Sequence, residues 1–461
     1  MHYTGKIILL FLFIFFTQQP LLAQTPPVNS GSTENYAFIN VAVIPMDRDT
    51  VLQDMTVLIS GDRISSVSPA SEIKLPEGTR TIDGKGKFLM PGLAEMHGHI
   101  PGKDQAQYAE NVLYLYISNG VTTVRNMSGN AYHLELREQV KNNEIPGPTI
   151  FAASPWLAGE NIKTPESADK IVRERKAEGF DLLKIGSLDP VTYEQMARTA
   201  HEINMPFGGH IPELVGLTGA LEARQTSIDH YDRYVEFLVP ENSRKGRSAG
   251  FFGSGIIDLV DMERMDEAIK MTIEAGTWNV PTLSLIEHLA NPQTAEEMIT
   301  RPEMRYMPRN VLEGWVKFKN EYSQRDDFQP EATAALVELR RNLTKALHDA
   351  GAGIVLGSDA PQFFNVPGFS IHHELMMMVK SGLTPYEVLV TGTRNAAEYF
   401  ETPDEFGTVQ EGQRADLILL NSNPLKDISK VQDRAGVMVR GTWYPEADIQ
   451  EKLKEIATSN M

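Results

Sequence analysis

The sequence predicts an α/β protein in which a (β/α)8 TIM barrel carries a small β-sandwich domain made by both ends of the chain. Between about residues 91 and 400, short apolar segments alternate with helical segments, as in parallel β/α units. Residues 36–90 are instead short strands with turn signals, too few to close a core alone. Strand-like segments within 401–445 supply the missing strands. We therefore expect the barrel to be inserted between the two halves of a composite β domain.

Six segments are expected to form the composite β domain. They are short, apolar or β-branched, and bounded by turn residues. Four lie in the N-terminal half and two in the C-terminal half: residues 38–44, 55–59, 64–67, 79–83, 415–420 and 436–440.

The predicted barrel has one strand for each β/α unit. The eight strand segments are residues 93–99, 121–125, 149–153, 182–186, 207–211, 227–231, 279–283 and 354–359. Helical segments lie between them at residues 105–118, 165–178, 190–204, 262–274, 331–350 and 385–400. Asp189 has the residue type of an N-cap, and Pro190 suits the first helical position. Eight such units fit a TIM barrel of about 250 residues with room for insertions.

Two insertions lengthen the barrel after its sixth and seventh strands. Residues 244–257 are rich in Gly and Ser and contain Phe251 and Phe252. This segment fits a lid over a site and an ordinary mobile loop equally well. Residues 287–327 form the second insertion and include a helical segment at 311–322.

The outermost segments have different signals. Residues 1–23 resemble a secretory signal peptide, with an apolar run at 7–16 and a small residue at Ala23. The run is shorter than the about 20 residues that span a bilayer, and a short N-terminal anchor is the alternative. We expect an exported protein, periplasmic or secreted, without a stable membrane anchor after cleavage. A flexible lead-in is expected at 24–35 and a helix or tail at 446–461.

Composition excludes several classes of function. The formal net charge of −18 argues against a nucleic-acid partner, because such binding needs a surface rich in Lys and Arg. The chain has no cysteine, which excludes disulfides, thiolate nucleophiles and Cys-ligated metals. Any metal must therefore have nitrogen and oxygen ligands.

Polar residues with metal-binding chemistry stand at the ends of the predicted barrel strands, where TIM barrels carry their active sites. His97 and His99 are separated by one residue, so in a strand both rings point to the same side. By themselves they could also be two histidines that fall together in a loop. Four further strand ends supply Lys184, His210, His230 and Asp359. Together they predict a metal centre of imidazole and carboxylate ligands.

Lys184 is the unusual member of this set. A lysine within an apolar strand is costly to bury as a cation, and an ammonium group cannot bind a metal. Addition of CO2 to the amine would give a carbamate with two oxygens, which can bridge two metal ions. The alternative is a lysine paired with a nearby carboxylate. Asp359 could bind one metal and accept a proton from a metal-activated water.

At this point the chain resembles the amidohydrolase superfamily, in its imidazolonepropionase-like and Xaa-Pro dipeptidase (prolidase)-like branch. The resemblance covers nearly the whole mature chain. It rests on Pro91-Gly92 before the H-G-H strand, and on the strand ends L-L-K-I-G, G-G-H, I-D-H and G-S-D. It also includes T-R-N-A-A-E from Thr393 and G-x-V-x-E-G-x-R-A-D-L-I-L-L from Gly407. A TIM barrel of the metal-dependent hydrolase type is what this resemblance implies.

The resemblance also implies a role for each residue. His97, His99 and Asp359 would hold one divalent ion, and His210 and His230 the second, with carbamylated Lys184 bridging; zinc is the expected metal. Asp359 and His230 are the implied catalytic residues. Tyr231 and Arg125 are candidates for substrate binding. An outward-facing aromatic and a structural salt bridge are the respective alternatives.

The implied reaction is hydrolysis of a C–N bond in a small-molecule substrate. Dipeptides of the Xaa-Pro type, N-acyl amino acids and cyclic amides are the expected substrates. A hydroxide shared by the metals would attack, with Asp359 as general base and then acid. A mononuclear enzyme like imidazolonepropionase or a deaminase is one alternative. A non-catalytic binding relative is the alternative from another class, and the sequence also allows a homo-oligomer.

Overall fold

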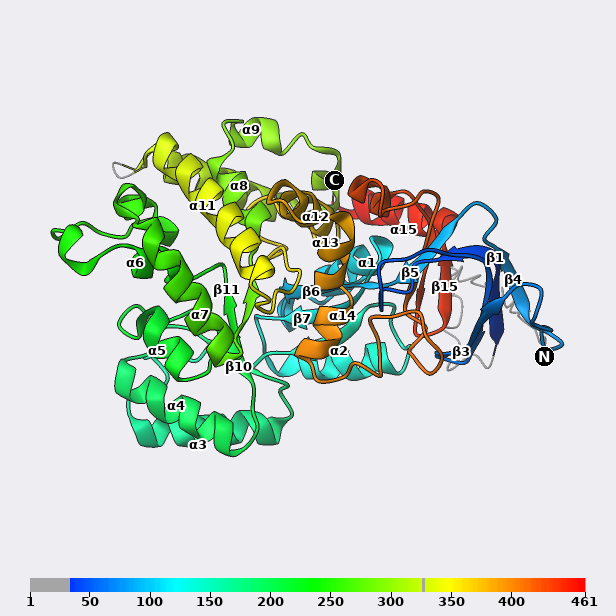
Figure 1. Cartoon of the computed structure of the whole chain (residues 1–461), viewed down its shortest axis with the longest axis horizontal. Helices are drawn as coiled ribbons and strands as arrows, with labels where there is room; N and C mark the ends of the chain where they lie inside the picture. Colours follow the sequence, from blue (N-terminus) through cyan, green and yellow to red (C-terminus); the bar gives the residue numbers. More distant parts are fainter. Residues whose placement is uncertain (1–33, 326–327, 461) are drawn as a thin grey trace, which may run out of the picture.

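The computed structural model of the protein describes residues 34–325 and 328–460. The predicted signal segment and nearly all of the predicted lead-in therefore lie outside the described residues. Figure 1 shows two parts: a barrel with its helices, and a β domain in which blue N-terminal strands lie beside the red strand β15. None of the described helices is long and apolar enough to cross a membrane.

The β domain contains strands from both chain ends in one sheet, as predicted. Its strands are β1 (Asn35–Val43), β2 (Leu52–Ser60), β3 (Arg63–Pro69), β4 (Arg80–Asp83), β5 (Phe88–Pro91), β13 (Leu417–Leu420), β14 (Arg434–Val439) and β15 (Thr442–Pro445). Their order is β15-β14-β13-β5-β1-β2-β3, and β4 branches from β1. The two halves meet where β5 pairs antiparallel with β13. All eight strands are thus joined by hydrogen bonds into a single branched sheet.

The core of the β domain also draws on both halves of the chain. Phe38 and Val57 from the N-terminal strands pack in one buried cluster with Leu417 and Met438 from the C-terminal strands. Because this apolar surface is completed only when both ends are present, the β domain ties together segments more than 300 residues apart.

The barrel strands follow directly after the β domain. They are β6 (Leu93–Gly98), β7 (Val121–Asn126), β8 (Thr149–Ala152), β9 (Leu183–Ile185), β10 (Phe207–Gly209), β11 (Ser227–Asp229) and β12 (Trp278–Val280). They pair in parallel as β6-β7-β8 and as β9-β10-β11-β12. A bridge between Ala153 and Leu182 joins the two sheets. All residues of β6 and β7 are buried, as expected of parallel strands covered on both faces.

The predicted eighth strand, residues 354–359, closes the barrel without forming a regular strand. Its backbone is hydrogen-bonded to both neighbours: Val355 N–H donates to the Asn279 carbonyl, and Met96 N–H donates to the Leu356 carbonyl. The buried carboxylate of Glu95 also accepts hydrogen bonds from the backbone N–H and the hydroxyl of Ser358. These isolated bonds are too few for a ladder, but they put the segment in the position of strand eight.

The helices agree with the predicted segments in most places. Those of the barrel are η1 (Lys103–Gln105), α1 (Ala106–Ser118), α2 (Ala131–Lys141), α3 (Pro165–Glu178), α4 (Pro190–Glu202), α5 (Gly216–Glu222), α6 (Tyr234–Leu238), η2 (Glu241–Ser243), η3 (Phe251–Leu259), η4 (Met262–Arg264), α7 (Met265–Ala275), α8 (Leu283–Ala290), α9 (Ala295–Met298), η5 (Pro302–Tyr306), α10 (Arg309–Ser323), α11 (Pro330–Asp349), α12 (Phe369–Lys380), α13 (Pro385–Thr391) and α14 (Arg394–Tyr399). The C-terminal segment contains η6 (Ile428–Gln432) and α15 (Glu446–Ser459). Asp189 caps α4 by accepting hydrogen bonds from the Val191 and Thr192 N–H groups.

Further predicted elements also differ from the structure. The helix expected at residues 385–400 is broken at Gly392 and Thr393 into α13 and α14, because Thr393 has φ −125° and ψ −94°. The strand expected at residues 279–283 ends at Val280, because Thr282 has a left-handed backbone and α8 begins directly after it.

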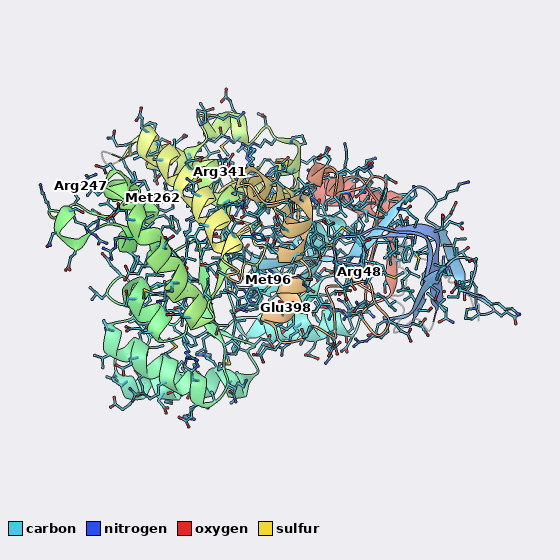
Figure 2. The ribbon with its side chains drawn as sticks, in the orientation of Figure 1. Arg48, Met96, Arg247, Met262, Arg341 and Glu398 are labelled. Carbon is cyan, nitrogen blue, oxygen red and sulfur yellow. The ribbon has the colours of Figure 1, made fainter. Side chains whose placement is uncertain are left out.

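In Figure 2, Met96 of β6 lies near the centre of the molecule, with Arg48 toward the β domain and Arg247 at the opposite end. Arg247 belongs to the first predicted insertion, which contains much of η3. The second insertion contains α9, η5 and α10. Both insertions lie in connections that leave the carboxyl ends of barrel strands, where the active sites of such barrels are found.

Candidate metal centre

Three predicted ligands meet where β6 and the eighth strand position end. Nε2 of His99 lies 2.6 Å from Oδ1 of Asp359, and Nε2 of His97 lies 3.6 Å from the same oxygen. One ligand atom from each residue lies within 4.8 Å of the others. This spacing fits side chains that share one ion.

The two remaining histidines lie beside this group. The ring of His230 is 4.6 Å from that of His97 and 5.0 Å from that of His210, measured between ring centres. Nε2 of His230 lies 3.8 Å from Oδ2 of Asp359. His97 and His230 are buried, whereas the side chains of His99 and His210 are 24% and 30% exposed. The structure thus brings all four predicted histidines to one end of the barrel.

Lys184 reaches the same point from β9. Its Nζ lies 3.5 Å from Nε2 of His97, and the side chain is buried. Gly209 on the neighbouring strand makes room for it, because a Cβ at Gly209 would lie 2.8 Å from Cδ and 3.1 Å from Nζ of Lys184. Among the described residues Lys184 forms no ion pair within 4.0 Å, although the nearby charges of Asp229 and Asp359 favour its protonated form against the effect of burial.

Three polar side chains that the sequence analysis did not identify fix the imidazole rings. Nδ1 of His97 lies 2.7 Å from Oδ2 of Asp229, and Nδ1 of His210 lies 2.7 Å from Oδ2 of Asp232. Nδ1 of His230 lies 2.8 Å from the hydroxyl of Thr282. With Nδ1 engaged, Nε2 of each ring is left for a metal, which is the usual arrangement of metal-binding histidines.

Burial sets the charge of these groups. It lowers the pKa of both His97 and His230 well below the usual value of 6.5, so the rings are neutral, as metal binding requires. Burial also lowers the pKa of Lys184. For Asp229, burial raises the pKa, but the charges of Arg125, Lys184 and His230 and the hydrogen bond from Arg125 together outweigh it, so the pKa is lowered overall.

Arg125 does not face the site, which corrects its prediction as a substrate-binding residue. Its guanidinium is fully buried and donates two hydrogen bonds to Asp229, at 2.9 and 3.1 Å. It also donates to the hydroxyls of Ser227 and Tyr399 and to the Met96 carbonyl. The alternative of a structural salt bridge is therefore the one observed. Through Asp229 this ion pair supports the ring of His97.

The hydroxyl group of Tyr231 is also buried and hydrogen-bonded within the protein. Its hydroxyl donates a hydrogen bond to Thr344 of α11, and the residue is only 3% exposed. The guanidinium carbon of Arg340 lies 5.5 Å from its ring centre. The hydroxyl is thus engaged away from substrate, although Tyr231 lines the pocket beside the centre.

The backbone at the site is unusual. His230, Tyr231, Thr282 and Asp359 have φ values of 60°, 51°, 46° and 63°. Left-handed conformations are costly for residues other than glycine and cluster at functional sites. Arg340, buried in α11, donates hydrogen bonds to the carbonyls of His230 and Pro281. It therefore holds the turns after β11 and β12 in place.

A pocket of about 240 Å³ opens beside the centre. Its lining includes the predicted ligand His210, the charged side chains of Arg233 and Glu236, and the rings of Phe251 and Phe252. The Phe252 ring centre lies 5.7 Å from that of His230. Phe251 and Phe252 belong to the 244–257 insertion, so this segment covers one side of the site. Whether it opens as a lid remains a prediction.

The donor set fits divalent ions. Four imidazoles and one carboxylate converge, and two of the imidazoles have carboxylate partners behind them. Imidazole and carboxylate ligands are typical of zinc and related transition metals.

Comparisons with known proteins agree with this geometry. The model of the amidohydrolase family matches residues 88–444. Imidazolonepropionase of Rubrobacter xylanophilus is 25% identical over an alignment of 403 positions, which covers 81% of this chain and 86% of that protein. Ochratoxinase of Aspergillus niger is 24% identical over 435 residues, covering 86% and 83% of the two chains.

Among solved structures, a Xaa-Pro dipeptidase with bound methionine matches with a TM-score of 0.67 at 20% identity, covering 89% of this chain and all of that one. The structure of A. niger ochratoxinase has a TM-score of 0.64 at 19% identity, covering 89% and 96%. These likenesses establish a TIM barrel with a small β-rich domain. The family match spans most of the chain. The protein therefore belongs to the amidohydrolase family, in its imidazolonepropionase- and prolidase-like branch, and is a hydrolase that acts on carbon–nitrogen bonds with a divalent metal cofactor.

Proposed function

We propose that the protein hydrolyses the C–N bond of a small amide at a centre of two divalent ions, zinc being the expected metal. Dipeptides of the Xaa-Pro type, N-acyl amino acids and cyclic amides are the substrates we expect. The observation that carries this proposal is the convergence of His97, His99, His210, His230, Lys184 and Asp359 at the carboxyl ends of the barrel strands.

In this proposal the ligands divide by position. His97, His99 and Asp359 would hold one ion, and His210 and His230 the other. Lys184 would serve both as a carbamate. Its buried amine supports this role, because a lowered pKa increases the neutral form that reacts with CO2. When bound, the ions would activate a water molecule and polarise the scissile carbonyl.

Asp359 has the central catalytic role. One of its oxygens faces His99 and the other faces His230, so the carboxylate stands between the two groups of ligands. It would accept the proton of the attacking water and deliver it to the leaving nitrogen. His230 is placed to stabilise the oxygen of the attacked carbonyl, with its ring oriented by Thr282. The rings of Phe251 and Phe252 would keep bulk water from the reacting bond.

The mononuclear alternative also has support from one observation. Only His97, His99 and Asp359 form a compact set of three ligand atoms among the described residues. In that case His230 and Asp359 would still serve the reaction, and Lys184 would have no ligand role. Metal content per chain separates the two possibilities.

The test combines metal analysis with a substrate panel. Purified protein is loaded with zinc in the presence of bicarbonate, and its metal content is measured after gel filtration. A panel of Xaa-Pro and other dipeptides, N-acyl amino acids and cyclic amides is then assayed for hydrolysis. Two equivalents of metal with amide hydrolysis is the expected result. One equivalent with full activity contradicts the binuclear centre, and no hydrolysis across the panel favours a binding relative.

We also propose that residues 1–23 direct export to the periplasm or medium. The sequence alone supports this. Expression of the full chain in a Gram-negative host, followed by N-terminal sequencing of the exported protein, is expected to give Gln24 as the first residue. A full-length chain confined to the cytoplasm contradicts the proposal.

A further inference from the structure

Trp156 is a large apolar side chain left in solvent beside the metal centre. It is 53% exposed, in a structure that buries most of its large apolar residues. Val191 and Leu214 are also exposed, at 64% and 77%. These three residues follow β8, β9 and β10, three neighbouring strands of the barrel. All three thus lie in connections that leave the carboxyl ends of barrel strands, where TIM barrels bind their substrates.

The backbone around Trp156 is fixed rather than free. After β8 the chain keeps pairing with the strand-four segment, through parallel bridges of Ala153 with Leu182 and of Leu157 with Ile185. Ala153 and Leu157 are four positions apart, whereas their partners Leu182 and Ile185 are three positions apart. The segment after β8 therefore has one extra residue, which forms a bulge. Bulges often lie next to active sites and redirect a side chain. Trp156 lies within this bulged segment, between the two bridged residues.

The indole lies directly against the predicted ligands. Its ring centre is 5.6 Å from that of His210, in an edge-to-face arrangement, and 6.0 Å from Nζ of Lys184. On the other side of His210 lies His230, which is covered by Phe252. The centre is thus flanked by one largely covered aromatic ring and one exposed aromatic ring.

We propose that Trp156 contacts the substrate and gives the enzyme a preference for amides with an aromatic or other planar apolar group. This inference rests on the proposed function. The pocket of about 240 Å³ is small, so a larger group must extend beyond it. Trp156 offers the exposed aromatic face nearest to His210 among the described residues. An aromatic group placed there would be removed from water and packed on the indole.

The test uses matched substrate pairs that differ only in a methyl or a benzyl side chain, Ala-Pro with Phe-Pro and N-acetylalanine with N-acetylphenylalanine. Trp156→Ala is expected to lower kcat/KM for the benzyl members about three- to tenfold, mainly through KM, because an aromatic contact contributes that much. The methyl members are expected to change much less. Trp156→Phe should restore most of the benzyl preference. Ile273→Ala, an exposed apolar residue of α7, is the control and should change neither pair.

Binding is measured separately with 3-phenylpropionate, which has no amide to hydrolyse. Wild-type protein should bind it several-fold more tightly than Trp156→Ala, by calorimetry with metal-loaded protein. Equal affinity, or equal effects of Trp156→Ala on both members of each pair, overturns the inference. If the wild-type protein hydrolyses neither pair, the proposed substrate range has failed, and the binding comparison alone then decides the role of Trp156.

Discussion

The ligands of the metal centre fall into two groups that differ in how completely they are assembled. His97, His99 and Asp359 lie on adjacent strand positions, and their ligand atoms already share a space 4.8 Å across. The second group, His210 and His230, has no carboxylate ligand of its own, and Lys184 between the groups offers only an amine. The first group is complete as the sequence encodes it. In the proposed binuclear centre, the second would require CO2 to convert Lys184 into a ligand.

The two groups therefore differ in what their assembly depends on. The first group depends on folding alone, because side chains from the first and the last strand positions of the barrel must meet. The second would depend also on Lys184, whose pKa is lowered by burial and whose side chain has room because Gly209 lies beside it. We expect metal binding to be sequential, with the first group filled at lower metal concentration. The following changes test that expectation, beginning with the largest effect.

Asp359→Asn should have the largest effect, because Asp359 belongs to the first group and also carries the proton. General acid–base catalysis contributes about 10²- to 10⁴-fold, so kcat/KM should fall about 10³-fold or more. Loss of the carboxylate should also weaken the first metal. Steady-state kinetics and metal content measure both effects. Asp404→Asn, an exposed carboxylate of the β-domain side, is the control. An active Asp359→Asn enzyme would remove the proposed base.

Lys184→Gln should affect the two groups unequally. The second ion should be lost while the first is retained, so the metal content should fall from two equivalents to one. We expect activity to fall about 10²-fold, the lower range for loss of a group that helps to position the reacting water. Acetate, which supplies a carboxylate without a covalent link, should restore part of the second metal's binding and part of the activity. Two tightly bound ions in Lys184→Gln would contradict the bridging carbamate.

How far the sequence predicts the site can be judged from these residues. The ligands were predictable because each is a polar residue at the end of an apolar strand, and barrel topology brings strand ends together. A functional role for Asp229 was also predictable, because it is an acidic residue next to His230 in a segment expected to be buried. Its partner could not be predicted, because the contact with His97 depends on packing between strands that are not neighbours.

Arg125 shows the limit of the same argument. It also ends an apolar strand, yet its guanidinium turns inward to Asp229, 104 residues away. A strand-end position does not determine which way a long side chain points. The fold was predictable for a related reason: apolar periodicity identifies strands and helices, whereas the left-handed turn at Thr282 and the break at Thr393 depend on tertiary contacts.

Asp229→Asn and Asp232→Asn compare the supports of the two groups directly. Replacing a carboxylate behind a metal-binding histidine usually weakens metal affinity about 10- to 100-fold. Asp229 is fully buried and also pairs with Arg125, whereas the side chain of Asp232 is 11% exposed. We therefore expect Asp229→Asn to weaken the first metal more than Asp232→Asn weakens the second. Competition with a chelator measures each affinity. Equal losses would mean that the two groups are supported alike.

The smallest expected effect is a change of stability with pH. It depends on one buried histidine from each group, His97 and His230. Both have a folded-state pKa well below 6.5, so below pH 6.5 the unfolded chain binds protons that the folded chain does not. The free energy of unfolding of the metal-free protein should therefore fall as pH decreases from 7 to 5. The contribution is at most about 1.4 kcal/mol per pH unit for each histidine.

Two buried acids act in the opposite direction. Burial raises the pKa of Glu95 to about 8 and that of Glu374 to about 7, so between pH 4.5 and their folded-state values the folded chain binds the extra protons. Comparing wild type with His230→Asn cancels their contribution. Urea titrations at pH 7, 6 and 5 give the free energy of unfolding of both proteins. The difference between them should depend on pH with a slope that corresponds to at most one proton, the one bound by His230. Identical slopes would mean that folding does not lower the pKa of His230, which would contradict the effect of its burial.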